Sequence, residues 1–364
     1  MASAASKIGV ASVMLPLTAA GAAYMGRGLL RVDWQRTLVD FFTGPGRTSR
    51  ILLLVFVAAN RKNMLFVWTA RVWGAVFRHV LAPRDPLPMG AVFHYTISQS
   101  HTPLLETDYN MHKSNSTYFT DLDVARTHLV MHLLVNGMRK IRNGEIVIRD
   151  KAGKEVPGRL TTALGSVFCS WKREILPYRG YEIWTRVLSW DRKWLVMVSY
   201  FVEKGKVLPT GFDMGSKLGA SGKVRNKATG AVADDSSEDF QKYVYATAVS
   251  KYVCKKGRFT VHPAIVLEAS GLLPERPGEG WRGGGDSDTG APDELADVET
   301  YPEWDWRKIE SKRREGLVFA DHFAALDELQ AEFDGGKHDA LGRFGPARFG
   351  TGDVEVGGGL ETKV

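Results

Sequence analysis

Three side chains capable of acid–base chemistry stand at alternate positions in the stretch ETDYNMHKSNSTY, residues 106–118: Asp108, Asn110 and His112. Alternate residues of an extended chain point to one side, and a chain that curls ahead of a helix also brings them together. A carboxylate can serve as general base or nucleophile, an amide can orient a carbonyl group, and an imidazole can polarise a water molecule. The pattern predicts a hydrolytic site, with a polar turn and a structural histidine as the simpler interpretation.

A long helix is expected directly after this stretch, because apolar residues recur at helical spacing over residues 118–140. Gly137 and the pair Asn143-Gly144 are expected to end it. Side chains that could cap its start or complement its dipole are Ser114, Ser116, Thr117, Asp121 and Asp123. The free N–H groups at the start of this helix would lie beside Asp108, where they could stabilise a developing oxyanion.

Strand-like sequence flanks the helix on both sides. One run precedes it at residues 91–100, and period-two or β-branched runs follow at 161–175, 181–190, 194–202 and 242–254. A first strand, one long helix and then a series of antiparallel strands predict an α+β fold in which a curved sheet wraps a single helix.

The N-terminal segment, residues 1–82, is hydrophobic and basic. Residues 1–91 carry 11 Lys and Arg against 3 Asp and Glu, a net charge of +8. Residues 8–25 contain no charge and could span a bilayer, be a cleaved targeting peptide or lie on the surface as a helix. Further apolar runs at 51–59 and 64–81, the second with Trp and Arg, favour an anionic membrane inside the cell over nucleic acid. The alternative is that these helices pack on the rest of the protein.

The remaining chain divides into a central domain, residues 90–272, and a C-terminal part, residues 273–364. The central domain is interrupted at 204–240 by a stretch poor in bulky apolar residues, which predicts a disordered insertion. The C-terminal part begins with an acidic Gly/Pro linker, followed by an expected helix over 306–333 and a disordered tail.

Composition sets limits on the function. The chain has 364 residues, 44% of them hydrophobic, enough for one sizeable core with appendages. Its two cysteines, Cys169 and Cys254, indicate thiols in a reducing compartment rather than a disulfide scaffold. No spacing of Cys and His resembles a zinc site, so we expect no metal.

The order of these features resembles the hotdog-fold acyl thioesterases. The motif D-x-N-x-H-x-x-N-x-x-Y is close to that of the acyl-ACP and 4-hydroxybenzoyl-CoA thioesterase-like families, although these often have two adjacent asparagines where this chain has Ser114-Asn115. A longer match resembles the eukaryotic thioesterase-like proteins with a hydrophobic N-terminal segment. It includes YFTDLDVAR on the helix, KRE at 172–174 and RVLSWDRKWLVMVSYFV at 186–202. The resemblance covers roughly residues 90–272.

The resemblance implies an acyl thioester hydrolase acting on acyl-CoA or an acyl carrier protein, without a metal or redox cofactor. It implies a homodimer with its site at a two-fold interface. The catalytic residues it implies are Asp108, Asn110, His112 and Glu174, and the substrate-binding residues are Ser114, Asn115 and Tyr118. Glu174 could instead pair with Lys172 or Arg173. Two other functions stay open: a catalytically silent acyl-CoA-binding or scaffolding module at a membrane, and a dehydratase, whose usual sequence setting is not found here.

Overall fold

The structure is a computed structural model that describes residues 33–81, 87–150, 152–209, 240–277, 280–282 and 304–332. The expectations for residues 8–25, for most of the insertion and the acidic linker, and for the tail beyond residue 332 lie outside this range.

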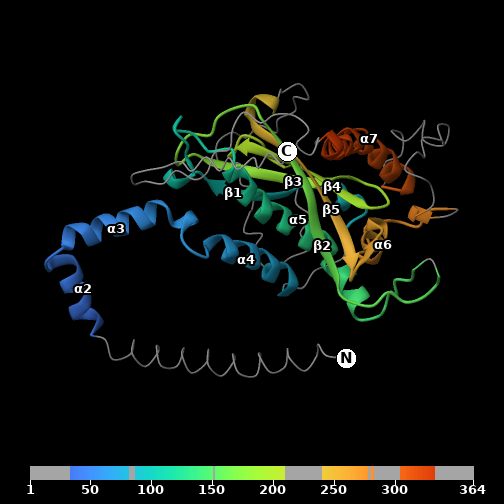
Figure 1. Cartoon of the computed structure of the whole chain (residues 1–364), viewed down its shortest axis with the longest axis horizontal. Coiled ribbons are helices and arrows are strands. Elements are labelled where there is room, and N and C mark those ends of the chain that lie inside the picture. Colours follow the sequence, from blue (N-terminus) through green and yellow to red (C-terminus); the bar gives the residue numbers. More distant parts are fainter. Residues whose placement is uncertain are drawn as a thin grey trace, which may run out of the picture.

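An antiparallel sheet forms the centre of the molecule (Figure 1). Its strands follow the order β1-β3-β4-β5-β2, and the short strand β6 pairs with β5. The strands are β1 (Thr96–His101), β2 (Leu160–Trp171), β3 (Gly180–Trp190), β4 (Trp194–Glu203), β5 (Val244–Lys256) and β6 (Phe259–Val261). Four of the five expected strands are confirmed, and most of their ends lie within a few residues of the expected ends. The first strand starts late because residues Ala91–Phe93 form a 3-10 turn, and β2 stops four residues before the expected end at Ile175.

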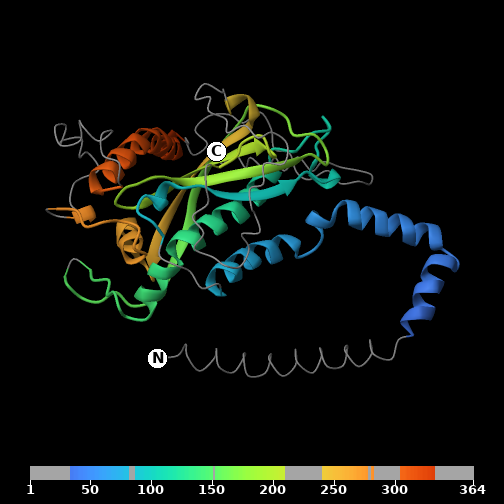
Figure 2. The same ribbon diagram turned by 180° about the vertical axis from the view of Figure 1, so that it is seen from behind.

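One long helix, α5 (Thr117–Arg142), lies against one face of the sheet (Figures 1 and 2). Near its start, Tyr118 and Leu122 pack with Ile183 and Phe201 in a fully buried cluster. A larger cluster continues this core along the helix, where its apolar residues meet β3, β4 and the short helix α6 (Pro263–Ala269). The expected α+β arrangement, a sheet wrapped around one helix, is therefore confirmed.

Gly137 does not end α5, contrary to the sequence-based expectation, because the helix continues to Arg142. A Cβ at this position would lie 2.4 Å from Ser270 Oγ and 2.5 Å from the Val266 carbonyl oxygen. The glycine instead allows α6 to approach the helix closely.

The C-terminal helix α7 (Trp306–Ala325) covers the other face of the sheet. Its Ala320 packs against Leu188, Val196 and Val198. The expected helix over 306–333 is thus divided, since residues Leu326–Glu332 form a 3-10 turn. The expected apolar stripe is only partly buried, because Phe323 is enclosed while Phe319 is exposed.

Within residues 33–81, the N-terminal segment forms the helices α2 (Trp34–Thr43), α3 (Arg47–Ala59) and α4 (Val67–Leu81). Helix α4 packs along α5, whereas α2 and α3 form an arm that extends away from the sheet in both views (Figures 1 and 2). Among the helices of the described ranges, none is both long and apolar enough to cross a membrane. The alternative expectation, that these helices pack on the rest of the protein, is therefore confirmed for α4 but not for α2 and α3.

Candidate active site

The loop of residues 107–113, here called the motif loop, folds back on itself just ahead of α5. Thr107 and Lys113 close it as an antiparallel bridge, and the Asp108 amide donates to the His112 carbonyl at 3.0 Å. Met111 adopts a left-handed φ of 61°. A non-glycine residue there costs on the order of 1 kcal/mol or more, so the surrounding contacts must hold the turn. The chain therefore curls in this region instead of running extended.

The turn brings three of the sequence-predicted residues together. His112 Nδ1 lies 3.5 Å from Asp108 Oδ1, and His112 Nε2 lies 3.6 Å from Glu174 Oε1. The side chains of Asp108 and His112 are 25% and 23% exposed, and that of Glu174 is 69% exposed. Both distances exceed an ordinary direct hydrogen bond, and the imidazole lies between the two carboxylates. The result is a carboxylate–imidazole–carboxylate row that is open to solvent.

Asn110 lies at the exposed tip of the motif loop. Its backbone N–H donates to Asp108 Oδ1 at 2.9 Å, which is an Asx turn. The contact orients the Asp108 carboxylate, and the residue next to Asn110, Tyr109, is fully open to solvent. Asn110 thus supports the row through its backbone.

Glu174 reaches the row from a connecting segment and not from a strand, because β2 ends at Trp171. The Lys113 amide donates to the Ile175 carbonyl at 2.8 Å, which fastens this segment to the motif loop. Arg173 turns away towards Glu203, 3.8 Å distant, and the expected alternative pairing with Glu174 is not formed.

The predicted substrate-binding residues separate into two groups. Ser114 and Asn115 lie at the start of α5, where Ser114 Oγ is 3.1 Å from Ser116 Oγ and Asn115 is exposed. Tyr118 is buried instead, with its ring against Trp171 and Phe201, and burial raises the pKa of its hydroxyl. In this structure Tyr118 is a core residue, whereas Ser114 is half-buried and Asn115 is exposed at the surface.

The opening of α5 offers N–H groups that no backbone hydrogen bond uses. Ser116 occupies the cap position, but its side chain makes no capping hydrogen bond. The amides of Thr117 and Tyr118 donate to the carbonyls of Ser114 and Asn115. Within the described part of the chain, the amides of Asn115 and Ser116 have no such partner. Together with the positive end of the helix dipole, they could hold an anionic oxygen.

A buried ion cluster beneath the motif loop was missed by the sequence analysis. It consists of Lys62, Glu106, Lys113 and Asp121. The Lys62 ammonium lies 2.8 Å from Glu106 Oε2 and 2.8 Å from Asp121 Oδ2, and Lys113 Nζ lies 2.6 Å and 3.2 Å from the same two oxygens. The Tyr181 hydroxyl donates to Asp121 Oδ2 at 2.5 Å. The charges are thus paired and hydrogen-bonded, as burial requires.

The electrostatics of the cluster centre on Asp121. Burial alone would raise its pKa, but the charges of Lys62, Lys113 and Arg71 outweigh burial and hold the pKa well below its ordinary range. Burial lowers the pKa of Lys62, and the nearby charge of Asp121 opposes that shift. The Asp121 side chain was expected to complement the helix dipole, and the structure shows it fully buried among these charges.

The sequence does contain one feature that could have indicated the buried ion cluster. Asp121 shares the helical stripe of Tyr118, Leu122 and Ala125, all of which are buried. A charged residue in an apolar stripe requires a buried partner. The partner Lys62 lies 59 positions away, and no local pattern identifies it.

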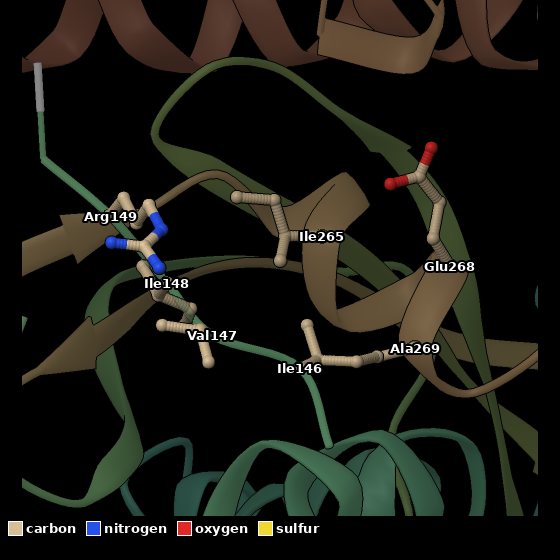
Figure 3. A pocket seen from close by; sticks show the side chains of 7 residues that line it. All are labelled: Ile146, Val147, Ile148, Arg149, Ile265, Glu268 and Ala269. Carbon is tan, nitrogen blue, oxygen red and sulfur yellow. The ribbon is translucent and has the colours of Figure 1, made fainter. Parts of the chain in front are cut away.

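An open cleft lies elsewhere, between the segment after α5 and helix α6 (Figure 3). Its lining residues are Ile146, Val147, Ile148, Arg149, Ile265, Glu268 and Ala269. It sits beyond the C-terminal end of α5, and a helix of 26 residues is about 39 Å long. The cleft is therefore remote from the motif loop and contains none of the sequence-predicted site residues.

Comparisons with known proteins complete the description of the site. The chain is 34% identical over 313 residues to the thioesterase poxG of Penicillium oxalicum, covering 82% of this chain and 90% of that protein. It is 32% identical over 338 residues to the probable thioesterase atnL of Emericella nidulans, covering 87% and 96%. The solved probable thioesterase YbaW of Escherichia coli matches 48% of this chain and 94% of its own at 11% identity, with a TM-score of 0.30, too slight a likeness to argue from. No family model matches the chain.

Proposed function

The chain belongs to the thioesterases, and from that membership we propose that it hydrolyses acyl thioesters of coenzyme A or of an acyl carrier protein at the row of Asp108, His112 and Glu174. The observation that carries the proposal is the placement of a partly exposed carboxylate and imidazole, 3.5 Å apart, directly ahead of an uncapped helix start. A thioester carbonyl needs a base on one side and N–H donors for its oxygen, and this arrangement supplies both.

In the proposed reaction, Asp108 accepts a proton from a water molecule as the water oxygen attacks the thioester carbon. The carbonyl oxygen becomes an oxyanion, which the amides of Asn115 and Ser116 stabilise. The carbon–sulfur bond then breaks, and the leaving thiolate takes up the proton held by Asp108. His112 keeps the carboxylate in place through the contact to Oδ1, and Glu174 supports the imidazole from the other side.

The experiment is an acyl-CoA hydrolysis assay on the full chain, with detection of the released thiol over a panel of acyl lengths. Turnover supports the hydrolase. Binding of acyl-CoA without any thiol release would contradict the hydrolase and favour the catalytically silent module instead.

We further propose a homodimer formed through β2. This strand is an edge of the sheet and exposes Leu164, Phe168 and Trp171. An exposed apolar edge strand is a template for pairing with another strand, and a second copy brings the same edge in antiparallel orientation.

Sedimentation equilibrium tests the dimer. We expect a mass of twice 40.3 kDa, and we expect Phe168→Lys to weaken dimerisation at least tenfold because it places a charge on the paired edge. The matched control is Phe319→Lys, which alters an exposed phenylalanine on α7 and should leave the dimer intact. A wild-type chain that stays monomeric at tens of micromolar contradicts the proposal.

We also propose that the arm of α2 and α3 docks on an anionic intracellular membrane. Helix α3 exposes apolar residues on all sides, including Leu53 and Phe56, and an uncovered surface of this kind favours burial in a lipid interface. Arg36, Arg47 and Arg50 on the same arm supply the charge that anionic headgroups attract.

Co-sedimentation of the full chain with vesicles tests this docking. We expect binding to phosphatidylcholine vesicles containing phosphatidylserine. The double substitution Leu53→Glu and Phe56→Glu should reduce binding at least tenfold, because two apolar side chains no longer enter the bilayer. Phe319→Glu on α7 is the matched control and should bind as the wild type does. Equal vesicle binding by the arm variant and the wild type argues against the arm as the docking site.

A further inference from the structure

We propose that the connection between α3 and α4, in particular Asn60 and Lys62, positions the motif loop for catalysis. This inference rests on the proposed hydrolase function. It makes the N-terminal segment a working part of the active site, and it assigns Lys62 the role of a positioning residue that acts through Glu106.

Lys62 enters the domain from outside it. It lies in the 3-10 turn Arg61–Asn63 between the two helices, yet its side chain is only 5% exposed. Its ammonium donates to the His101 carbonyl at 2.9 Å, at the end of β1, as well as to Glu106 and Asp121. One cation thus joins a strand end, the residue before the motif loop and the second turn of α5.

Glu106 transmits this contact to the loop. Its Oε2 atom accepts from Lys62 at 2.8 Å and from Lys113 at 2.6 Å, so the same oxygen links the connection to the far stem of the loop. Its carbonyl accepts from the Ser114 amide at 2.7 Å. The two ends of the motif loop, its stems, are therefore held together by hydrogen bonds between residue 106 and residues 113–114.

Asn60 supplies a second, uncharged contact to the same stem. It is buried, its Oδ1 accepts from the Leu105 amide at 2.9 Å, and its Nδ2 donates to the Phe56 carbonyl at 3.0 Å. Asn60 and Lys62 therefore fix two consecutive residues, 105 and 106, that lead into the loop.

The loop requires such support. Met111 sits in a strained conformation, and His112 is 3.5 Å and 3.6 Å from its carboxylates, with no direct hydrogen bond in the row. The placement of Asp108 and His112 then depends on the backbone hydrogen bond between them and on the contacts that hold the two ends of the loop. A shift of about 1 Å in a reacting group can cost on the order of a hundredfold in rate.

The chain offers a matched control in Arg71. This residue also comes from the N-terminal segment and binds Asp121, through Oδ1 at 2.9 Å, but the contact is to the helix and not to Glu106. If the buried ions only stabilised the fold, neither variant would show a selective loss of kcat once folded, whereas the positioning role predicts that loss for the Lys62 variant alone.

The experiment compares steady-state thioester hydrolysis by the full wild-type chain, Lys62→Met and Arg71→Gln, each checked for folding by circular dichroism. We expect Lys62→Met to lower kcat tenfold to a hundredfold and to change KM less than threefold. We expect Arg71→Gln to keep kcat within threefold of the wild type. Lys62→Arg retains the charge and should recover part of the lost kcat.

A double variant separates positioning from general destabilisation. If Lys62 acts by placing the row, Lys62→Met should lower kcat less than threefold further in a His112→Gln background, because the row is already broken. An equal loss in both backgrounds, or a Lys62→Met chain as active as the wild type, overturns the inference.

If Lys62→Met does not fold, Asn60→Ala tests the same stem without disturbing the ion cluster, with an expected threefold to tenfold loss in kcat, and an unchanged kcat there overturns the inference. A wild-type chain without thiol release would instead overturn the proposed function, and the positioning role would fall with it.

Discussion

Replacing Asp108 with asparagine is expected to lower kcat for thioester hydrolysis by about 10²–10⁴-fold, with little change in KM. Asparagine has the same shape, and its Oδ1 can still accept from the Asn110 amide that now binds Asp108 at 2.9 Å. The turn therefore survives, but the amide cannot take a proton from water. The thiol-release assay on the folded variant measures the effect.

The matched control is Asp150→Asn. Asp150 also anchors a tight turn, where its Oδ1 accepts from the amides of Ala152 and Lys154, both at 2.9 Å. It lies beyond the opposite end of α5, so the same chemical change should leave kcat within twofold of the wild type. If Asp108→Asn keeps more than a third of the wild-type kcat, the carboxylate serves only the turn and the catalytic role is wrong.

The second large effect concerns stability. Asp121→Asn should lower the free energy of unfolding at pH 7 by about 3–5 kcal/mol, because it removes a buried charge that faces Lys62, Lys113 and Arg71. Glu106 alone would then face the two buried lysines. Urea denaturation of the two proteins measures the difference.

The effect should depend on pH in a definite direction. The folded-state pKa of Asp121 is depressed, so its contribution is fully present above the ordinary aspartate pKa of about 3.9 and is lost as the pH falls towards the folded-state value. The gap between the wild type and Asp121→Asn should therefore narrow below about pH 4. Glu315→Gln, in the exposed pair with Lys312, is the control and should cost no more than about 1 kcal/mol. A gap below 1 kcal/mol at pH 7 would show that the cluster stabilises nothing.

Local periodicity explains why most of the fold could be predicted. The strand pair β3 and β4 is separated by the tight turn Asp191–Lys193, and Asp191 Oδ1 accepts from the amides of Lys193 and Trp194. The long helix likewise carries its burial pattern in its own sequence. Each of these signals lies within one element, where spacing alone identifies the buried face.

The features that escaped prediction depend on contacts between distant parts of the chain. Lys62 and Glu106 are 44 residues apart, and nothing near Lys62 distinguishes it from an exposed lysine. Gly137 reads as a helix stop until α6 is known to cross it. Helix α3 is apolar on all sides, which local sequence cannot assign to a core or to a membrane surface.

The candidate site could be predicted from the sequence only in part. The motif identified Asp108 and His112, which the structure places 3.5 Å apart, and the resemblance added Glu174. Tyr118 was grouped with the substrate-binding residues because it completes the motif, but its ring faces the core. A motif records which residues occur together and does not record which way each side chain points.

Single-turnover hydrolysis in H₂¹⁸O, with the full chain in molar excess over an acyl-CoA, tests the central claim most directly. Water attack assisted by Asp108 predicts one thiol released per substrate and one ¹⁸O in the carboxylic acid product, with no label in the peptide that contains Asp108. The absence of thiol release, or label in that peptide in place of the product, would contradict water attack assisted by Asp108.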